Sequence, residues 1–163
     1  MSKGNKKTTN AARLLAGAGI EFELIEYEAD EEIGENFGMR VSQKTGIPPE
    51  QSFKTLVAKG DKTGYMTVCV SVNSEIDLKK LARESGNKKT ELIATKELLP
   101  VTGYIRGGVS PIGMKKKFPV YIDASCEKYE KTAISGGMCG VTLLLSREDL
   151  VKYTGAKVCD IAE

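Results

Sequence analysis

The chain has 163 residues, of which 40% are apolar and 28% charged, so global disorder is excluded and one domain with a sizeable core is expected. Its net charge is only +2, from 24 basic and 22 acidic residues, which excludes a uniformly basic coat for tight, non-specific nucleic-acid binding. It contains no histidine, which excludes Ser–His and Cys–His nucleophile activation and zinc ligation by histidine.

The first third of the sequence predicts two helices with a strand between them. A helix is expected at 10–18, where apolar residues follow helical spacing and Gly19 stops it. The segment FELIEY, at 22–27, alternates apolar and acidic residues, as a half-buried strand does. A weaker helix is expected at 35–45 and ends at Gly46.

The middle of the sequence predicts a β-hairpin, a helix and two short elements. The turn GDKTG joins the two strands of the hairpin. The elements expected are, in chain order, strands at 53–59 and 65–72, an amphipathic helix at 77–84, a short strand at 91–94, and a one-turn helix capped by Thr95 that Pro100 ends.

The last third starts with a glycine-rich stretch, 103–117, which we call the glycine loop. The elements expected after it are a strand at 118–122, a helical turn at 127–131, strands at 133–135 and 141–145, and a helix that starts at Ser146 with a capping pattern, S-x-x-D. Because strands and helices do not alternate strictly, a doubly wound Rossmann sheet is not indicated. We expect one α+β domain, 1–163, with a mixed sheet surrounded by helices and a flexible tail at 1–7.

The sequence carries no sign of secretion or of membrane insertion. The chain opens MSKGNKK without the apolar region of a signal peptide, and no run of 18 apolar residues occurs. Cys69, Cys126, Cys139 and Cys159 are scattered without C-x-x-C spacing. Reduced thiols in a cytoplasmic protein are therefore expected, as inert core residues.

The glycine loop reads GYIRGGVSPIGMKKK and matches neither G-x-x-x-x-G-K-[ST] nor G-x-G-x-x-G. Within it, glycines bracket a Ser-Pro step at 107–113, which gives free φ angles on both sides of a fixed proline. Such a segment can direct successive N–H groups at one carbonyl or anion. The alternative is a turn with a solvated lysine tail.

Three further positions are candidates for chemistry. Lys54 shares a strand face with Leu56. Its ammonium must therefore snorkel to solvent from an edge strand, form an ion pair, or serve in function. The segment ISGGMCG, at 134–140, is either a hairpin turn or a source of one hydroxyl and further N–H donors. Tyr27 and Tyr104 either pack in the core or cover a ligand.

These segments together resemble the YbaK family of bacterial trans-editing factors, the Cys-tRNA(Pro) deacylases, which are related to the editing domain of bacterial prolyl-tRNA synthetases. The similarity covers essentially the whole chain. The matching residues are Phe53 to Leu56, Thr102 to Tyr104, Gly107 to Lys116, Ser135 to Gly137, and Gly140.

The resemblance implies an α+β fold with a mixed, bifurcated sheet and a crevice for the 3′ end of an aminoacyl-tRNA. It implies that Lys54 is the catalytic lysine, that Gly108 is a loop contact, and that Ser135 and Tyr27 surround the aminoacyl group. The other matching residues expected to bind substrate are Phe53, Gly107, Ser110, Pro111, Gly136 and Gly137. Many members carry a basic residue where Cys139 stands and an acidic one where Thr142 stands, so we carry over no role for these two.

The implied reaction removes cysteine from Cys-tRNA(Pro), and from Cys-tRNA(Cys) as a further substrate, without a metal or another cofactor. The thiol of the cysteinyl ester attacks its own carbonyl, so the protein supplies no nucleophile. A transient complex with prolyl-tRNA synthetase and tRNA is expected in the cytoplasm, without a membrane. Two alternatives stay open: a deacylase for Ala-tRNA(Pro) or another small mischarged amino acid, and a non-catalytic module that binds tRNA or the synthetase.

Overall fold

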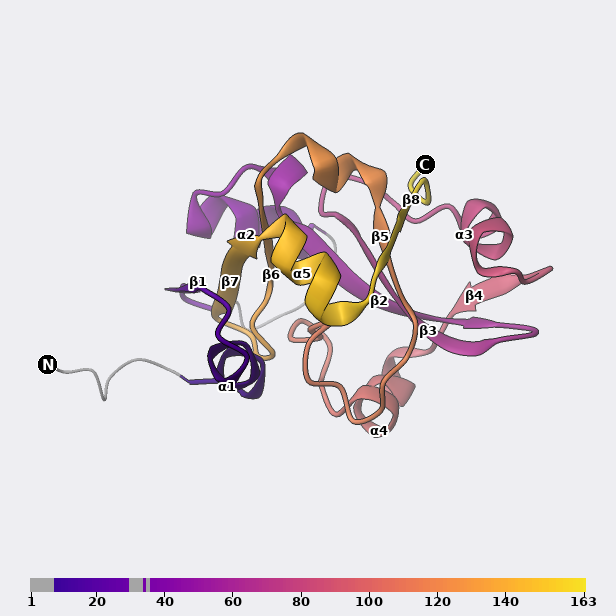
Figure 1. Cartoon of the computed structure of the whole chain (residues 1–163), viewed down its shortest axis with the longest axis horizontal. Helices are drawn as coiled ribbons and strands as arrows, with labels where there is room; N and C mark the ends of the chain where they lie inside the picture. Colours follow the sequence, from indigo (N-terminus) through magenta and orange to yellow (C-terminus); the bar gives the residue numbers. More distant parts are fainter. Residues whose placement is uncertain (1–7, 30–33, 35) are drawn as a thin grey trace, which may run out of the picture.

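The computed structural model describes residues 8–29, 34 and 36–163 (Figure 1). The tail predicted at 1–7 and the first residue of the helix predicted at 35–45 lie outside the described residues. The helices described are α1 (Asn10–Gly17), α2 (Phe37–Thr45), α3 (Leu78–Ser85), α4 (Leu98–Thr102) and α5 (Arg147–Thr154), with the 3₁₀ turns η2 (Pro49–Gln51), η3 (Thr95–Glu97) and η4 (Ala124–Lys128).

The strands form two sheets, which one β-bridge joins among the described residues. The larger sheet has the order β4-β2-β3-β5-β8 and the smaller one the order β1-β7-β6. The strands are β1 (Phe22–Glu26), β2 (Phe53–Gly60), β3 (Gly64–Ser71), β4 (Thr90–Leu92), β5 (Val120–Asp123), β6 (Lys131–Ser135), β7 (Val141–Ser146) and β8 (Lys157–Cys159). A parallel bridge between Ser52 and Ala133 joins the sheets. The predicted α+β fold with a mixed, bifurcated sheet is confirmed.

Strand pairing explains why the larger sheet is mixed. β2 pairs antiparallel with β3 and with β4, whereas β5 lies parallel to β3 on one side and to β8 on the other. The smaller sheet is antiparallel and places Phe22 of β1 opposite Leu145 of β7. Strands from the two ends of the chain are therefore neighbours, and the hairpin β2–β3 is the local pairing around which the larger sheet grows.

Side chains cap the N-termini of α1 and α5, and the cap of α5 is the one that the S-x-x-D pattern predicts. The Thr9 Oγ1 atom accepts a hydrogen bond from the Ala12 N–H at 3.1 Å at the start of α1. The Ser146 Oγ atom accepts one from the Asp149 N–H at 3.2 Å at the start of α5. These bonds satisfy N–H groups that have no acceptor inside the helix, and they fix where each helix begins.

The structure differs from the prediction in three short elements. Pro100 does not end a helix; it is the third residue of α4, in the first turn, where its missing N–H has no acceptor in any case. The turn predicted at 127–131 is η4, which starts earlier because the Asp123 side chain accepts from the Ser125 N–H at 3.1 Å. The strand β8 was not predicted, because only its pairing with β5 makes it a strand.

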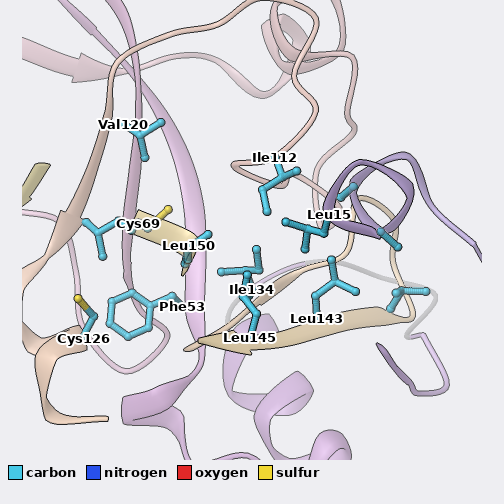
Figure 2. Packing of buried hydrophobic residues seen from close by; sticks show 14 residues of the cluster. Leu15, Phe53, Cys69, Ile112, Val120, Cys126, Ile134, Leu143, Leu145 and Leu150 are labelled. Atoms are coloured by element: carbon cyan, nitrogen blue, oxygen red, sulfur yellow. The ribbon is translucent and has the colours of Figure 1, made fainter. Parts of the chain in front are cut away.

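The main hydrophobic core lies where the two sheets, α1 and α5 meet, and it also anchors the glycine loop (Figure 2). Figure 2 shows Ile112 of the loop beside Leu15 of α1, and both side chains are fully buried. Phe53 reaches this core from β2 and Leu150 from α5. Burial of Ile112 holds the middle of the glycine loop against the rest of the protein.

A second core cluster covers the other face of β2 and β3. It contains Val68 and Val70 of β3 and Leu81 of α3. Because Lys54 lies opposite Val70 in the β2–β3 pair, its side chain starts from this second face, together with Leu56. None of the helices that the structure describes is both long and apolar enough to cross a membrane.

Candidate active site

A pocket of about 480 Å³ opens where the two sheets separate. β4 pairs with β2 only at Ala58–Gly60, and the β-bridge that joins β6 to the β2 end of the larger sheet is at Ser52. Between these contacts, one edge of β2 has no partner strand among the described residues. The pocket occupies this open edge, so side chains from both faces of β2, from Phe53 to Val57, line it.

Five of the residues singled out in the sequence line this one pocket although they come from four separate segments. They are Tyr27 just after β1, Phe53 and Lys54 of β2, Gly107 of the glycine loop and Ser135 at the end of β6. The structure therefore brings together the lysine, the glycine loop and the hydroxyl group that the sequence pointed to.

The Lys54 ammonium is held at the pocket by a carboxylate. Its Nζ atom lies 3.3 Å from the Oε2 atom of Glu75, and the Lys54 side chain is 26% exposed. The Glu75 carbonyl accepts a hydrogen bond from the Glu163 N–H at 2.9 Å, and Ile76 forms a β-bridge with Ala162. The last residues of the chain thus fix the turn that carries Glu75.

The glycine loop presents unused backbone donors at the pocket wall. Gly107 has a φ of +87°, which L side chains rarely adopt, and the Gly108 N–H closes the turn by donating to the Ile105 carbonyl at 2.9 Å. Gly107 and Val109 both line the pocket, and their N–H groups make no hydrogen bond with another described residue. Two neighbouring donors are the means by which a backbone stabilises a carbonyl oxygen that gains negative charge.

Ser135 has its hydroxyl oriented by the second glycine turn, 136–140. Its Oγ atom accepts from the Gly137 N–H at 3.1 Å, so the hydroxyl proton stays available to donate to a ligand. Thr142, across the β6–β7 pair, lines the same pocket. Tyr27 is tied to this turn because its N–H donates to the Gly140 carbonyl at 2.9 Å.

The remaining predicted residues support the pocket and do not line it. Gly136 and Gly137 shape the second turn: the Gly136 N–H donates to the Val141 carbonyl, and Gly137 has a φ of +100°. Ser110 is fully buried, with its Oγ atom accepting from the Ile112 N–H. Pro111 is also buried and faces a second crevice of about 360 Å³ on the other side of the loop.

Gly108, the predicted loop contact, is buried where the two glycine segments touch. A Cβ atom added to Gly108 would lie 2.9 Å from the Cα atom of Met138. Tyr104 stands beside this contact: its hydroxyl donates to the Ile112 carbonyl, and its ring is 3.1 Å from where a Gly137 Cβ would be. Tyr104 therefore packs the two segments together and does not line the pocket.

Sequence reasoning missed two charged residues of the pocket, Glu75 and Arg106. Glu75 lies in a turn and carries no motif, and only the long-range pairing of β2 with β3 brings it to Lys54. Arg106 was visible inside the glycine loop, directly before Gly107 and Gly108. Its position beside those two glycines was the available signal.

The cysteines offer no activated nucleophile. Burial raises the pKa of the Cys69 thiol to about 12 and that of Cys126 to about 11. Burial also raises the pKa of Cys139, the cysteine of the second glycine turn. Among the residues that the structure describes, no cluster of three His, Cys, Asp or Glu side chains could hold a metal ion. The polar groups that the pocket offers to a ligand are the charged side chains of Lys54, Glu75 and Arg106, hydroxyl groups and backbone N–H groups.

Comparison with known proteins agrees with this inventory. The family model described as the aminoacyl-tRNA editing domain matches residues 39–153, a range that contains Lys54, Gly107 and Ser135. The chain is 38% identical over 159 residues to EbsC of Enterococcus faecalis (strain ATCC 700802 / V583), a proposed Cys-tRNA(Pro)/Cys-tRNA(Cys) deacylase. The match covers 98% of this chain and 96% of EbsC.

A solved structure extends the agreement to three dimensions. The crystal structure of a proposed trans-editing enzyme for prolyl-tRNA synthetase superposes with a TM-score of 0.81 at 27% sequence identity, over 96% of this chain and 99% of that one. Sequence, fold and the composition of the pocket lead to one assignment. This chain belongs to the aminoacyl-tRNA editing domain family, the YbaK-type proteins.

Proposed function

We propose that this protein is a trans-editing deacylase that removes cysteine from Cys-tRNA(Pro), with Cys-tRNA(Cys) as a further substrate. The observation that carries the proposal is the convergence of Lys54, the unpaired N–H groups beside Gly107, and Ser135 on one pocket. The name of the relative EbsC supports the choice of cysteine as the amino acid.

The proposed reaction uses the thiol of the substrate. The cysteinyl sulfur attacks the ester carbonyl, a carbon–sulfur bond forms, the carbon–oxygen bond to the ribose breaks, and the thiol proton passes to the released ribose oxygen. The resulting thiolactone then hydrolyses in water. Such a mechanism suits a chain without histidine, because the protein needs no nucleophile of its own.

The backbone N–H groups, Lys54 and Ser135 each have a role in the proposed mechanism. The N–H groups of Gly107 and Val109 donate to the carbonyl oxygen as it gains charge, an effect of roughly 3–4 kcal/mol for one well-placed donor. Lys54 adds a positive charge close to the same oxygen or to the terminal phosphate. Ser135 donates its hydroxyl proton to the aminoacyl group. Holding the thiol near the carbonyl supplies several kcal/mol more.

The test is a deacylation assay with Cys-, Ala-, Ser- and Pro-charged tRNA(Pro), with and without prolyl-tRNA synthetase. Lys54→Ala is expected to lower kcat/KM for the cysteinyl substrate at least about tenfold, since it removes a charge from the reacting centre. Lys59→Ala is the matched control, because Lys59 lies on the same strand, exposed and outside the pocket.

The outcomes separate the alternatives. Fast release of cysteine with slow release of serine, which differs only by oxygen in place of sulfur, supports attack by the substrate thiol. Equal rates for alanine and cysteine would assign the protein to the alternative class with a small-residue pocket. Binding without release would leave a non-catalytic module. Stimulation by the synthetase would support a transient complex in the cytoplasm.

A further inference from the structure

Three exposed apolar side chains belong to the segments that line the pocket or pack beside it, and one of these segments also carries Arg106. Leu92, Ile105 and Met138 are 43%, 57% and 38% exposed, and Arg106 is also exposed. Leu92 and Arg106 line the pocket itself. We call these four residues the rim patch. Such a grouping of apolar side chains marks a binding surface more often than singly scattered ones do.

The rim patch is built by the contact between the two glycine segments. Gly108 packs directly on the backbone of Met138, as the 2.9 Å distance of its absent Cβ atom shows. The thiol of Cys139 lies 3.9 Å from the Arg106 carbonyl. The side chains of Ile105 and Arg106 on one segment and of Met138 on the other are therefore carried by backbones held against each other.

The charge of Arg106 has no counter-charge among the residues that the structure describes. Its side chain makes no ion pair or hydrogen bond with any residue that the structure describes. A guanidinium group binds phosphate with two parallel hydrogen bonds, and apolar side chains pack against the faces of bases. A guanidinium group without a partner among the described residues, carried next to exposed apolar side chains, fits a short, unpaired piece of nucleic acid.

We propose that the rim patch binds the unpaired nucleotides that precede the terminal adenosine of the RNA. Their bases lie against Ile105, Met138 and Leu92, and a linking phosphate lies on Arg106. The proposal rests on the proposed function, because the aminoacyl end must occupy the pocket. A pocket of about 480 Å³ has the size of a single drug-sized ligand, so the preceding nucleotides have to leave through its mouth.

The experiment compares substrates of increasing length with the complete protein. Cysteine is presented as an ester of adenosine, of the trinucleotide CCA and of tRNA(Pro), and kcat/KM is measured for each. In wild type, kcat/KM for the trinucleotide ester is expected to exceed kcat/KM for the nucleoside ester. The double variant Ile105→Gln with Met138→Gln is expected to lower the ratio of these two kcat/KM values at least about fivefold. This corresponds to a loss of about 1 kcal/mol of binding free energy. An unchanged ratio overturns the proposal.

Arg106→Ala tests the phosphate contact by its dependence on salt. Loss of one phosphate contact is expected to reduce the slope of log Kd against log salt concentration by about one. An unchanged slope overturns the assignment of Arg106. For the double variant Ile105→Gln with Met138→Gln, the matched control is Leu14→Gln, because Leu14 is exposed to a similar extent, 37%, and lies outside the rim patch.

A binding measurement separates this proposal from the proposed function. The fluorescence anisotropy of a 5′-labelled single-stranded RNA that ends in CCA reports binding without any deacylation. Weaker binding by the double variant supports the rim patch even if no substrate of the panel is cleaved. If RNA binding and the substrate ratio stay at the wild-type values and only stimulation by the synthetase is lost, the rim patch is a protein interface and the RNA proposal is wrong.

Discussion

Gly108 and Met138 lie in backbone contact: a Cβ atom on Gly108 would come within 2.9 Å of the Met138 Cα atom. This contact is the point at which the glycine loop and the second glycine turn touch. One of these segments carries the N–H groups of the pocket and the other orients the Ser135 hydroxyl. The separation of the two backbones therefore sets the geometry of the candidate active site.

Gly108→Ala is expected to destabilise the protein and to slow deacylation. Because the added methyl group meets backbone atoms, the two segments have to move apart, and overpacking of this kind costs about 1–3 kcal/mol. Chemical unfolding measures the loss. The control is Gly17→Ala at the end of α1, where an added Cβ meets nothing within 4 Å, and which is expected to be neutral or stabilising by up to about 1 kcal/mol.

Tyr104→Phe removes the hydrogen bond that the Tyr104 hydroxyl donates to the buried Ile112 carbonyl. We expect the free energy of unfolding to fall by about 1–3 kcal/mol, because that carbonyl is left without a partner. Tyr65→Phe is the matched control: Tyr65 packs on the same cluster, and its hydroxyl makes no hydrogen bond with a described residue. Equal changes in the free energy of unfolding of the two variants would show that the Tyr104 hydrogen bond does not stabilise the fold.

Glu75→Gln is expected to change substrate binding and to leave stability nearly intact. The Glu75 side chain is 73% exposed, and an exposed ion pair contributes about 0–1 kcal/mol to folding. Removal of its charge leaves Lys54 free to attract the phosphates of tRNA, so KM should fall up to about fivefold at low salt and less at high salt. Steady-state kinetics at two salt concentrations measure both effects.

The control for this variant is Glu84→Gln, which breaks the ion pair of Glu84 with Lys157, 3.1 Å long and outside the pocket. Its KM should equal that of wild type. If Glu75→Gln raised KM, the carboxylate would instead be holding Lys54 in its working position, and the competition between Glu75 and phosphate would be ruled out.

Asp123 links the larger sheet to the end of the chain and makes stability depend on acid pH. Burial raises the pKa of its carboxyl group, but hydrogen bonds from Ser125, Ile161 and Ala162 outweigh burial and hold the pKa below its usual value. A group with a lowered pKa in the folded state stabilises the protein fully above its unfolded pKa of about 3.9. This stabilisation is lost as the pH falls through the folded value.

Asp123→Asn is therefore expected to be less stable at pH 7 by about 1.5–3 kcal/mol, because an amide presents N–H groups where the carboxylate oxygens accept from backbone N–H groups. The difference from wild type should shrink below about pH 4. Urea unfolding between pH 3 and 7 measures it. Asp160→Asn, at a side chain 66% exposed and paired with Lys80, is the control that should follow wild type.

Local features of the fold were predictable, and long-range ones were not. The β2–β3 hairpin and the cap of Ser146 depend on neighbouring residues, so the sequence indicates them directly. The strand β8 has no alternation of its own and becomes a strand only through its pairing with β5. Pro100 was placed at a helix end because its position within the first turn depends on where α4 begins.

The candidate site shows the same division. Lys54 and Ser135 stand in recognisable patterns, so their presence in one pocket could be anticipated. Glu75 reaches Lys54 only because β3 returns along β2, and no spacing in the sequence signals that pair. Ser110 and Pro111 belong to the same motif as Gly107, but the loop turns them to its buried side, a direction that residue types alone do not reveal.

The pairing of Phe22 with Leu145 has a consequence for synthesis on the ribosome. Strands so distant along the polypeptide meet late, and folds dominated by such non-local pairings form in milliseconds to seconds. The smaller sheet cannot close before β7 has emerged, and the wall of the pocket that contains Ser135 belongs to that sheet. The pocket should therefore be incomplete in any nascent chain that stops before β7, and such chains should be inactive.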